Sequence, residues 1–245
     1  MQFSWSICAR WCMAFIMETI AENIKRVRDA ISDIALKSGR DPGGIALVAA
    51  AKTKPAALVR QAIAAGVDAI GENRVQEMLE KNAQDAYSGA PLHFIGQLQS
   101  NKINKIVGVC DLIESVGSQP LISAIGKRAA SLGIVQDILV EVNIGKEPQK
   151  SGILPEEAED ALALASLTEG VRVLGFMAIP PIQDKIERNC NLFDLMCNLF
   201  IDMSEKKYDN VVMQFLSMGM SDSYVEAIRH GANMVRIGSA IFGGR

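Results

Sequence analysis

Two short apolar runs that end in glycine and serine are the most informative part of this chain. The first is Phe215-Leu-Ser-Met-Gly-Met-Ser-Asp222, which leads into a helix-like segment from Ser221 to His230, and the second is Val235-Arg-Ile-Gly-Ser239. Such segments present backbone N–H groups, small hydroxyls and a helix N-terminus to one point in space. This arrangement is typical of a site that binds a phosphate monoester.

The rest of the chain repeats one unit, a strand-like apolar run followed by a helix-like segment, and the two runs above belong to the last units of this series. The strand-like apolar runs begin at positions 45, 69, 92, 112, 137, 171, 211 and 234. Helix-like segments are expected at 20–34, 55–66, 75–82, 101–107, 119–132, 155–167, 190–203 and 221–230. Every strand-like run except the last is followed by a helix-like segment. This alternation, at this length, predicts an α/β fold of the (β/α)8 TIM-barrel type.

An open, doubly wound sheet is the competing fold. Such a sheet usually has a glycine-rich turn after its first strand. Here the first strand-like run ends in Lys52-Thr-Lys-Pro55, and no low-complexity linker or shift in composition marks a second domain. We therefore expect one barrel domain.

Barrel geometry brings the distant motifs together. Active sites of such barrels lie at the carboxyl ends of the strands, and phosphate is often bound by the loops after the seventh and eighth strands. Ser217–Ser221 follows the seventh run, Gly238 and Ser239 follow the eighth, and Lys52 ends the first, which lies next to the eighth in a closed barrel. A lysine beside a phosphate cradle indicates a phosphorylated aldehyde held as a Schiff base. The candidate is pyridoxal 5'-phosphate.

Composition excludes several classes of function. The chain is 245 residues long, 49% apolar and 22% charged, with a net charge of -3 and no basic stripe, which argues against a nucleic-acid partner. No apolar run reaches the roughly 20 residues needed to span a bilayer. Five cysteines at irregular spacing indicate reduced thiols in a cytoplasmic protein. Because Cys8 and Cys12 lack a second pair of ligands, no metal site is expected.

The first 16 residues differ from the rest. They are apolar, contain both tryptophans and carry Arg10 in their middle, whereas a signal peptide carries its charge before the apolar stretch. We interpret residues 1–16 as an extension or a mis-assigned start, with the barrel domain spanning 17–245. The alternatives are an additional helix on the barrel or a weak organelle-targeting segment.

Seven motifs, in order along the chain, resemble those of the pyridoxal phosphate homeostasis proteins. They are Leu47-Val-Ala-Ala-Ala-Lys-Thr-Lys-Pro55, Gly71-Glu-Asn-Arg-Val-Gln-Glu77, His93-Phe-Ile-Gly-Gln-Leu-Gln-Ser-Asn-Lys102, Val142-Asn-Ile-Gly145 with Lys150-Ser-Gly152, Gly175-Phe-Met-Ala-Ile-Pro180, Leu216-Ser-Met-Gly-Met-Ser-Asp222 and Val235-Arg-Ile-Gly-Ser-Ala-Ile-Phe-Gly243. The resemblance covers the chain from about Ile20 to Arg245. Ala51 departs from it, because serine is common there in the family, and residues 1–16 lie outside it.

The resemblance implies a single barrel similar to the N-terminal domain of bacterial alanine racemases, with pyridoxal phosphate bound covalently on Lys52. It implies no established catalytic activity, hence no catalytic residues, and a role in buffering vitamin B6 species. The implied partners are amino and keto acids, or apo-enzymes that depend on pyridoxal phosphate. We expect the protein to be a monomer. The expected cofactor-binding residues are Lys52, Asn73, Ser217, Gly219, Ser221, Arg236, Gly238 and Ser239.

Several of these residues also have simpler explanations. Arg236 lies inside the last strand, where it either faces the pyridine nitrogen, as the resemblance implies, or forms a structural ion pair with a carboxylate of the barrel. Asn73 either reaches the ring hydroxyl of the cofactor or is a turn residue. His93 is expected to be a core histidine with satisfied hydrogen bonds, Lys54 to be exposed, and Met220 to pack around the ring.

An amino-acid racemase or decarboxylase and a Schiff-base aldolase compete with the carrier hypothesis. A racemase of this fold needs a second base, usually a tyrosine from a further domain, but the chain ends soon after its eighth strand-like run. Its tyrosines, Tyr87, Tyr208 and Tyr224, are expected in loops or helices away from strand ends. An aldolase that used Lys52 without a cofactor would need a nearby carboxylate, and Glu72 is the near candidate.

Overall fold

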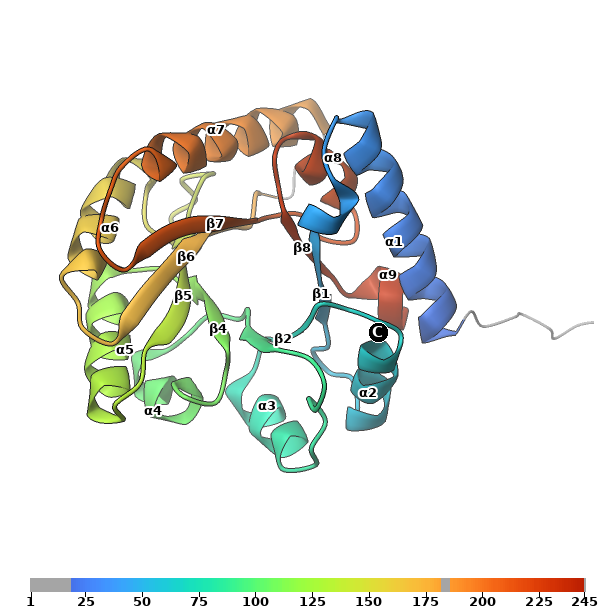
Figure 1. The fold of residues 1–245 in the computed structure, drawn as a ribbon, viewed down its shortest axis with the longest axis horizontal. Helices are drawn as coiled ribbons and strands as arrows, with labels where there is room; N and C mark the ends of the chain where they lie inside the picture. The colour runs from blue at the N-terminus through green and yellow to red at the C-terminus, as the bar shows by residue number, and fades with distance from the viewer. Residues whose placement is uncertain (1–18, 182–185, 245) are drawn as a thin grey trace, which may run out of the picture.

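The computed structural model describes residues 19–181 and 186–244, and their strands form one closed barrel (Figure 1). Neighbouring strands are parallel and follow one another in sequence order, and β8 pairs with β1. The strands are β1 (Ala46–Ala50), β2 (Ala69–Glu72), β3 (Leu92–Phe94), β4 (Leu112–Val116), β5 (Gln136–Val142), β6 (Val171–Ala178), β7 (Val211–Ser217) and β8 (Met234–Ile237). The predicted (β/α)8 barrel is confirmed, and each strand begins within one residue of its predicted start.

Helices surround this barrel (Figure 1). The α-helices are α1 (Ile20–Lys37), α2 (Ala56–Ala64), α3 (Val75–Asn82), α4 (Ile103–Ile106), α5 (Gln119–Ser131), α6 (Ala158–Ser166), α7 (Ile186–Ser204), α8 (Tyr224–Arg229) and α9 (Ser239–Phe242). Within the described residues, three short 3-10 helices accompany them: η2 (Pro42–Gly44), η3 (Ser100–Lys102) and η4 (Pro155–Glu157).

The helices at the carboxyl end of the chain differ from the expectation in two ways. Helix α8 begins at Tyr224 rather than at Ser221, because the Met220 N–H donates to Ser223 Oγ and the residues between them form a turn. Helix α9 follows β8, where no helix was predicted. Four residues are too few to show helical periodicity, so α9 could not be predicted from the pattern of apolar residues.

Helix α1 covers the barrel where it closes. Its apolar residues face inward at helical spacing, and it packs against α2, α8 and α9 (Figure 1). A capping box begins the helix: Thr19 Oγ1 accepts the Glu22 N–H at 3.2 Å, and Glu22 Oε2 accepts the Thr19 N–H at 2.7 Å. Helix α1 therefore packs on the helices that flank β8, which contains Arg236, and β1, which Lys52 follows.

Apolar side chains fill the lower part of the barrel interior. They come from six different strands and form a buried cluster separate from the core between strands and helices. The cluster consists of Val48, Ala69, Leu112, Leu139, Met177 and Met234. Packed apolar side chains thus close the barrel interior on the side away from the carboxyl ends of the strands. The polar side chains of the interior lie toward the carboxyl ends.

Some expectations concern residues that the structure does not describe. The proposed extension, residues 1–16, and its boundary at Met17 lie outside the described residues. Within the described part, no helix is both long enough and apolar enough to cross a membrane. Three cysteines fall within this part, Cys110, Cys190 and Cys197, and all three are free thiols.

Candidate functional site

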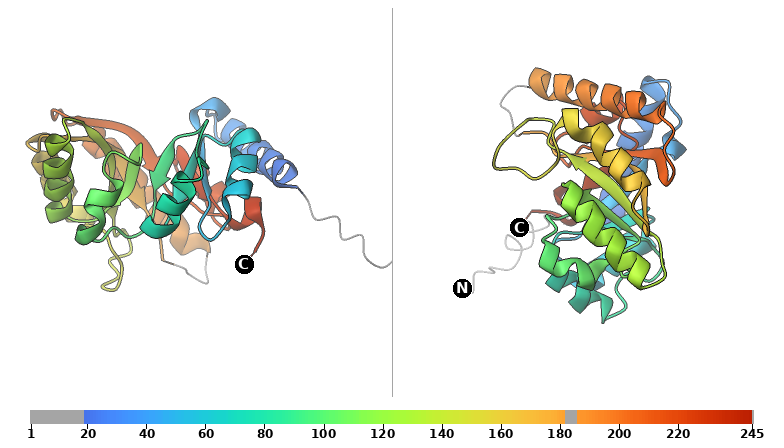
Figure 2. Two further views of the ribbon diagram at one scale, coloured as in Figure 1. Left: turned by 90° about the horizontal axis from the view of Figure 1, so that it is seen from below. Right: turned by 90° about the vertical axis from the view of Figure 1, so that its left-hand side faces the viewer.

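The barrel interior changes from apolar to polar toward the carboxyl ends of the strands. Because side chains alternate along a strand, residues two positions beyond the lower apolar layer also face inward. These residues include Ala50, Gly71, Glu114, Glu141 and Arg236. His93 of β3 and Ser217 of β7 join them through hydrogen bonds to Glu114. The loop after β5 and the C-terminal segment project from this same face in the left view of Figure 2. Charged groups therefore form the floor of the site.

Arg236 is the centre of a buried network inside the barrel. Its side chain is 3% exposed; Nη2 donates to the Ala178 carbonyl oxygen at 3.0 Å, and Nη1 donates to Ser217 Oγ. The Ser217 hydroxyl donates in turn to Glu114 Oε2 at 2.6 Å, and the guanidinium lies 3.7 Å from the same oxygen. The structural ion pair considered from the sequence is therefore present, and it anchors the guanidinium from below.

Glu114 is ionised in this network. Burial alone would raise the pKa of Glu114, but the bond from His93 Nδ1 at 2.7 Å, the nearby charges of His93 and Arg236 and the Ser217 hydroxyl lower it below its ordinary value. His93 is the satisfied core histidine that was expected. Sequence reasoning missed Glu114, although a lone glutamate in the buried strand β4 was the available signal.

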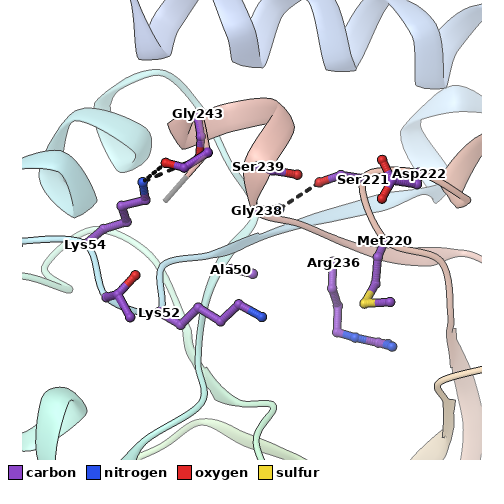
Figure 3. Close-up of a pocket in the computed structure, with 12 residues that line it drawn as sticks. Ala50, Lys52, Lys54, Met220, Ser221, Asp222, Arg236, Gly238, Ser239 and Gly243 are labelled. Atoms are coloured by element: carbon purple, nitrogen blue, oxygen red, sulfur yellow. Dashed lines mark hydrogen bonds between the residues drawn. The ribbon is translucent and has the colours of Figure 1, made fainter. Parts of the chain in front are cut away.

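Lys52 directly follows β1 and lines a cavity of about 260 Å³ (Figure 3). Its amine has no hydrogen-bond or ion-pair partner among the described residues, and its side chain extends in the direction of Arg236. The same cavity is lined by Ser221, Arg236, Gly238 and Ser239. Of the expected cofactor-binding residues, these five meet in one place.

The loops after β7 and β8 meet at the Ser221 hydroxyl. Ser221 Oγ accepts the N–H groups of Gly238 and Ala240, each at 3.3 Å. The Ser221 oxygen thus marks a point on which two backbone donors converge at the start of α9, an arrangement suited to an anion. Gly219 lets the loop pass close to α8: its φ is 93°, and a Cβ there would lie 2.7 Å from Ala227 Cβ.

The remaining expected residues do not line this cavity. The Ser217 hydroxyl is committed to Glu114 and Arg236, and Gly219 lies beneath α8. Asn73 lines a separate pocket together with Phe94 and Lys102. Its Oδ1 is buried and accepts no hydrogen bond from any described residue, so Asn73 still has an acceptor to offer.

Lys54 differs from the expectation of an exposed side chain. It is half-buried and lines the cavity, and its ammonium donates to the carbonyl oxygens of Phe242 and Gly244 at 3.2 Å each and of Gly243 at 3.5 Å (Figure 3). The reason is tertiary, because closure of the barrel brings the segment after α9 onto the loop after β1. Sequence reasoning had no signal for this contact.

The candidate groups for other chemistries lie elsewhere. Glu72 points away from the barrel interior and accepts from Lys81 Nζ at 2.6 Å and from the Tyr87 hydroxyl at 3.1 Å. Tyr208 and Tyr224 also lie outside the strands and do not line the Lys52 cavity. Met220, by contrast, lines the Lys52 cavity.

Comparison with known proteins agrees with this geometry. Residues 17–245 match the family model described as alanine racemase, N-terminal domain. A pyridoxal phosphate homeostasis protein of Aquifex aeolicus is 38% identical over 224 residues, which cover 91% of this chain and 97% of that protein. The structure of PipY from Synechococcus elongatus with pyridoxal phosphate bound superposes with a TM-score of 0.79 at 30% identity, covering 92% of this chain and all of PipY.

Alanine racemases share the barrel at lower similarity. The enzyme of Clostridium difficile superposes with a TM-score of 0.67 at 17% identity, and the match covers 91% of this chain but 57% of the racemase. This likeness concerns the fold. The identity to the curated relatives, over nearly their whole length, is far higher, and the chain belongs to the pyridoxal phosphate homeostasis protein family.

Proposed function

We propose that this protein binds pyridoxal 5'-phosphate covalently on Lys52 and acts as a carrier in vitamin B6 homeostasis. One observation carries the proposal: the Lys52 amine, which has no partner among the described residues, shares a cavity with Ser221, whose hydroxyl oxygen accepts two backbone N–H groups at the start of α9. The cavity has the size of a compact ligand, since pockets for drug-sized molecules are about 300–1,000 Å³. The names of the relatives and the ligand in the PipY structure support the same cofactor.

The residues present fit this group. When bound, pyridoxal phosphate supplies an aldehyde and an electron-withdrawing ring. The neutral Lys52 amine would hold the cofactor through the carbon of its aldehyde, with loss of one water molecule. Ser221, Ser239 and the Gly238 N–H would hold the phosphate at the start of α9. Asn73 lines a separate pocket here, so a contact of its Oδ1, which accepts no hydrogen bond from the described residues, with the ring hydroxyl would require Asn73 to turn toward Lys52 when the cofactor binds.

Arg236 would face the ring nitrogen. A guanidinium carries more N–H groups than the two acceptors that Arg236 uses here, so it can still donate toward the cavity. It cannot accept a proton, and its charge disfavours protonation of a neighbouring nitrogen. A pyridine ring whose nitrogen stays unprotonated withdraws electrons weakly. Such a ring suits a carrier of the cofactor better than an enzyme that relies on strong electron withdrawal by the ring.

We infer further that the protein is a non-catalytic, cytoplasmic monomer that exchanges its cofactor with apo-enzymes or reacts with amino or keto acids. Among the described residues that line the cavity there is no tyrosine, and the carboxylate present, Asp222, is exposed. Racemisation needs a second positioned acid or base, which typically contributes about 10²–10⁴-fold to the rate. Sedimentation of the holoprotein would test the monomer.

Reduction with borohydride tests the attachment. Protein saturated with pyridoxal phosphate should be yellow, and reduction should fix the cofactor on the peptide that contains Lys52. Lys52→Ala should remain colourless, whereas Lys105→Ala, an exposed lysine outside the cavity, should behave like the wild type. A saturated wild-type protein without label on Lys52 would overturn the proposal.

A chiral assay separates the carrier from a racemase. Alanine, serine and lysine should racemise no faster with the holoprotein than with free pyridoxal phosphate. Turnover at ordinary enzyme rates, on the order of 1 s⁻¹ or more, that disappears in Lys52→Ala would favour the racemase instead.

A further inference from the structure

Lys52 lies in a tight turn with an unusual backbone conformation. The Lys54 N–H donates to the Ala51 carbonyl oxygen at 3.1 Å, so Lys52 and Thr53 are the two central residues of a β-turn. Thr53 has a φ of 62°. Glycine or asparagine normally occupies a left-handed central position, and a β-branched residue there is an outlier. The turn that presents Lys52 is therefore strained.

Helix α3 holds this turn at both peptide groups that flank Lys52. On one side, Lys81 Nζ donates to the Ala51 carbonyl oxygen at 2.9 Å. On the other side, Glu77 Oε2 accepts the Thr53 N–H at 2.8 Å. Glu77 and Lys81 are four residues apart, hence on one face of the helix. Two charged side chains of opposite sign thus bind the backbone immediately before and after the lysine.

Both holding side chains are themselves fixed. The Lys81 side chain is 8% exposed and forms an ion pair with Glu72 of β2, which also accepts from Tyr87. Glu77 Oε1 accepts from Arg74 at 3.1 Å. Burial alone would raise the pKa of Glu77, but the Thr53 N–H and Arg74 lower it, which keeps the acceptor ionised at neutral pH.

We propose that Glu77 and Lys81 are positioning residues that keep the strained turn in the conformation that directs the Lys52 amine into the cavity. The inference rests on the proposed function, in which Lys52 carries the cofactor. Neither residue lines the Lys52 cavity, so they act on the lysine through the backbone of the turn. Without these two side chains, we expect Thr53 to relax toward negative φ, and the Lys52 amine would then no longer be directed into the cavity.

Substitutions at Glu77 and Thr53 test the proposal together. Glu77→Ala removes the acceptor and should weaken retention of pyridoxal phosphate about tenfold. Glu77→Gln keeps an acceptor oxygen and should retain most of the affinity. Thr53→Gly, added to Glu77→Ala, should restore much of the loss, because glycine adopts positive φ without strain. Glu80→Ala on the same helix is the control, since exposed Glu80 bonds through its side chain to Gln76 and not to the turn.

Amide exchange of Thr53 gives a measurement that needs no cofactor. The Thr53 N–H should be protected in the wild type and in Glu77→Gln, and should exchange at least about tenfold faster in Glu77→Ala. Equal exchange in all three proteins, or equal cofactor retention in wild type and Glu77→Ala, would overturn the positioning role. If Lys52 of the wild type is labelled by borohydride reduction, the proposed function stands even where the positioning role of Glu77 fails. If Lys52 of the wild type is not labelled, both proposals fail.

Discussion

Two buried charge networks lie on opposite sides of the barrel wall, and they differ in how their carboxylates are satisfied. The inner network, Arg236, Ser217, Glu114 and His93, occupies the barrel interior. The outer network, Lys81, Glu72 and Tyr87, lies between β2 and α3. Each contains a fully buried glutamate that accepts from a hydroxyl and has a cation within ion-pair distance.

Their pKa values shift in opposite directions. In the inner network, donors reach both oxygens of Glu114, and they lower its pKa despite complete burial. In the outer network, burial raises the pKa of Glu72, and Lys81 and Tyr87, which share one oxygen, offset part of that rise. The second oxygen, Oε2, accepts no hydrogen bond from the described residues. The two networks therefore differ in how donors and charges offset burial: they outweigh it at Glu114 and offset only part of it at Glu72.

Removal of the inner cation should have the largest effect. Arg236→Met leaves an ionised, buried Glu114 beside Ser217 and His93, and it should lower the free energy of unfolding by about 3–5 kcal/mol at pH 7. Urea denaturation of the protein without cofactor measures this loss. Lys52→Met, at an exposed lysine, is the control and should change stability by less than about 0.5 kcal/mol. A loss as small as that of the control would contradict the ionised state of Glu114.

Removal of the outer cation should cost less. Lys81→Met should lower the free energy of unfolding by about 1–3 kcal/mol at pH 7, because Glu72 can take up a proton and keeps its bond to Tyr87. Urea denaturation over a range of pH measures the difference from wild type.

The pH dependence distinguishes the two networks. Since the folded-state pKa of Glu72 is raised, the folded protein binds more protons than the unfolded chain between the ordinary value of 4.5 and the raised one. Stability therefore falls as the pH rises through this window, and the deficit of Lys81→Met should shrink as the pH falls from 7 toward 5. The deficit of Arg236→Met should change less over the same interval, because His93 still lowers the pKa of Glu114. Equal shrinkage in both variants would show that the two glutamates are alike.

The sequence predicted those parts of the molecule that depend on local repetition. All eight strands and their order follow from the alternation of apolar runs with helical segments, and the meeting of Lys52 with Ser221 and Gly238 follows from barrel closure. Arg236 was recognised as a buried charge that requires a partner. These inferences needed periodicity and topology, which a single sequence contains.

The remaining features depend on contacts that have no local signature. The left-handed Thr53 could not be expected, because threonine is not a residue that marks positive φ. The Lys54 contact with the C-terminal carbonyl groups arises when distant segments close upon each other. Ser217 was expected at the phosphate, but its hydroxyl joins Glu114 to Arg236, a contact across the barrel that pattern alone does not reveal.

A matched pair of hydroxyl deletions gives the smallest and sharpest comparison. Ser217→Ala and Tyr87→Phe each remove one hydroxyl that donates to a buried glutamate. Because Glu114 is held ionised, loss of its charge-assisted bond should cost about 1.5–3 kcal/mol, whereas loss of the bond to Glu72 should cost about 0.5–1.5 kcal/mol.

Tyr87→Phe should also raise the pKa of Glu72 further, since the hydroxyl lowers it, and so widen the pH range in which stability falls with rising pH. Urea titrations of both variants at pH 5 and pH 7 measure both effects. If Tyr87→Phe proved the costlier at pH 7, Glu72 rather than Glu114 would be the more firmly ionised carboxylate, and the contrast between the two networks would be reversed.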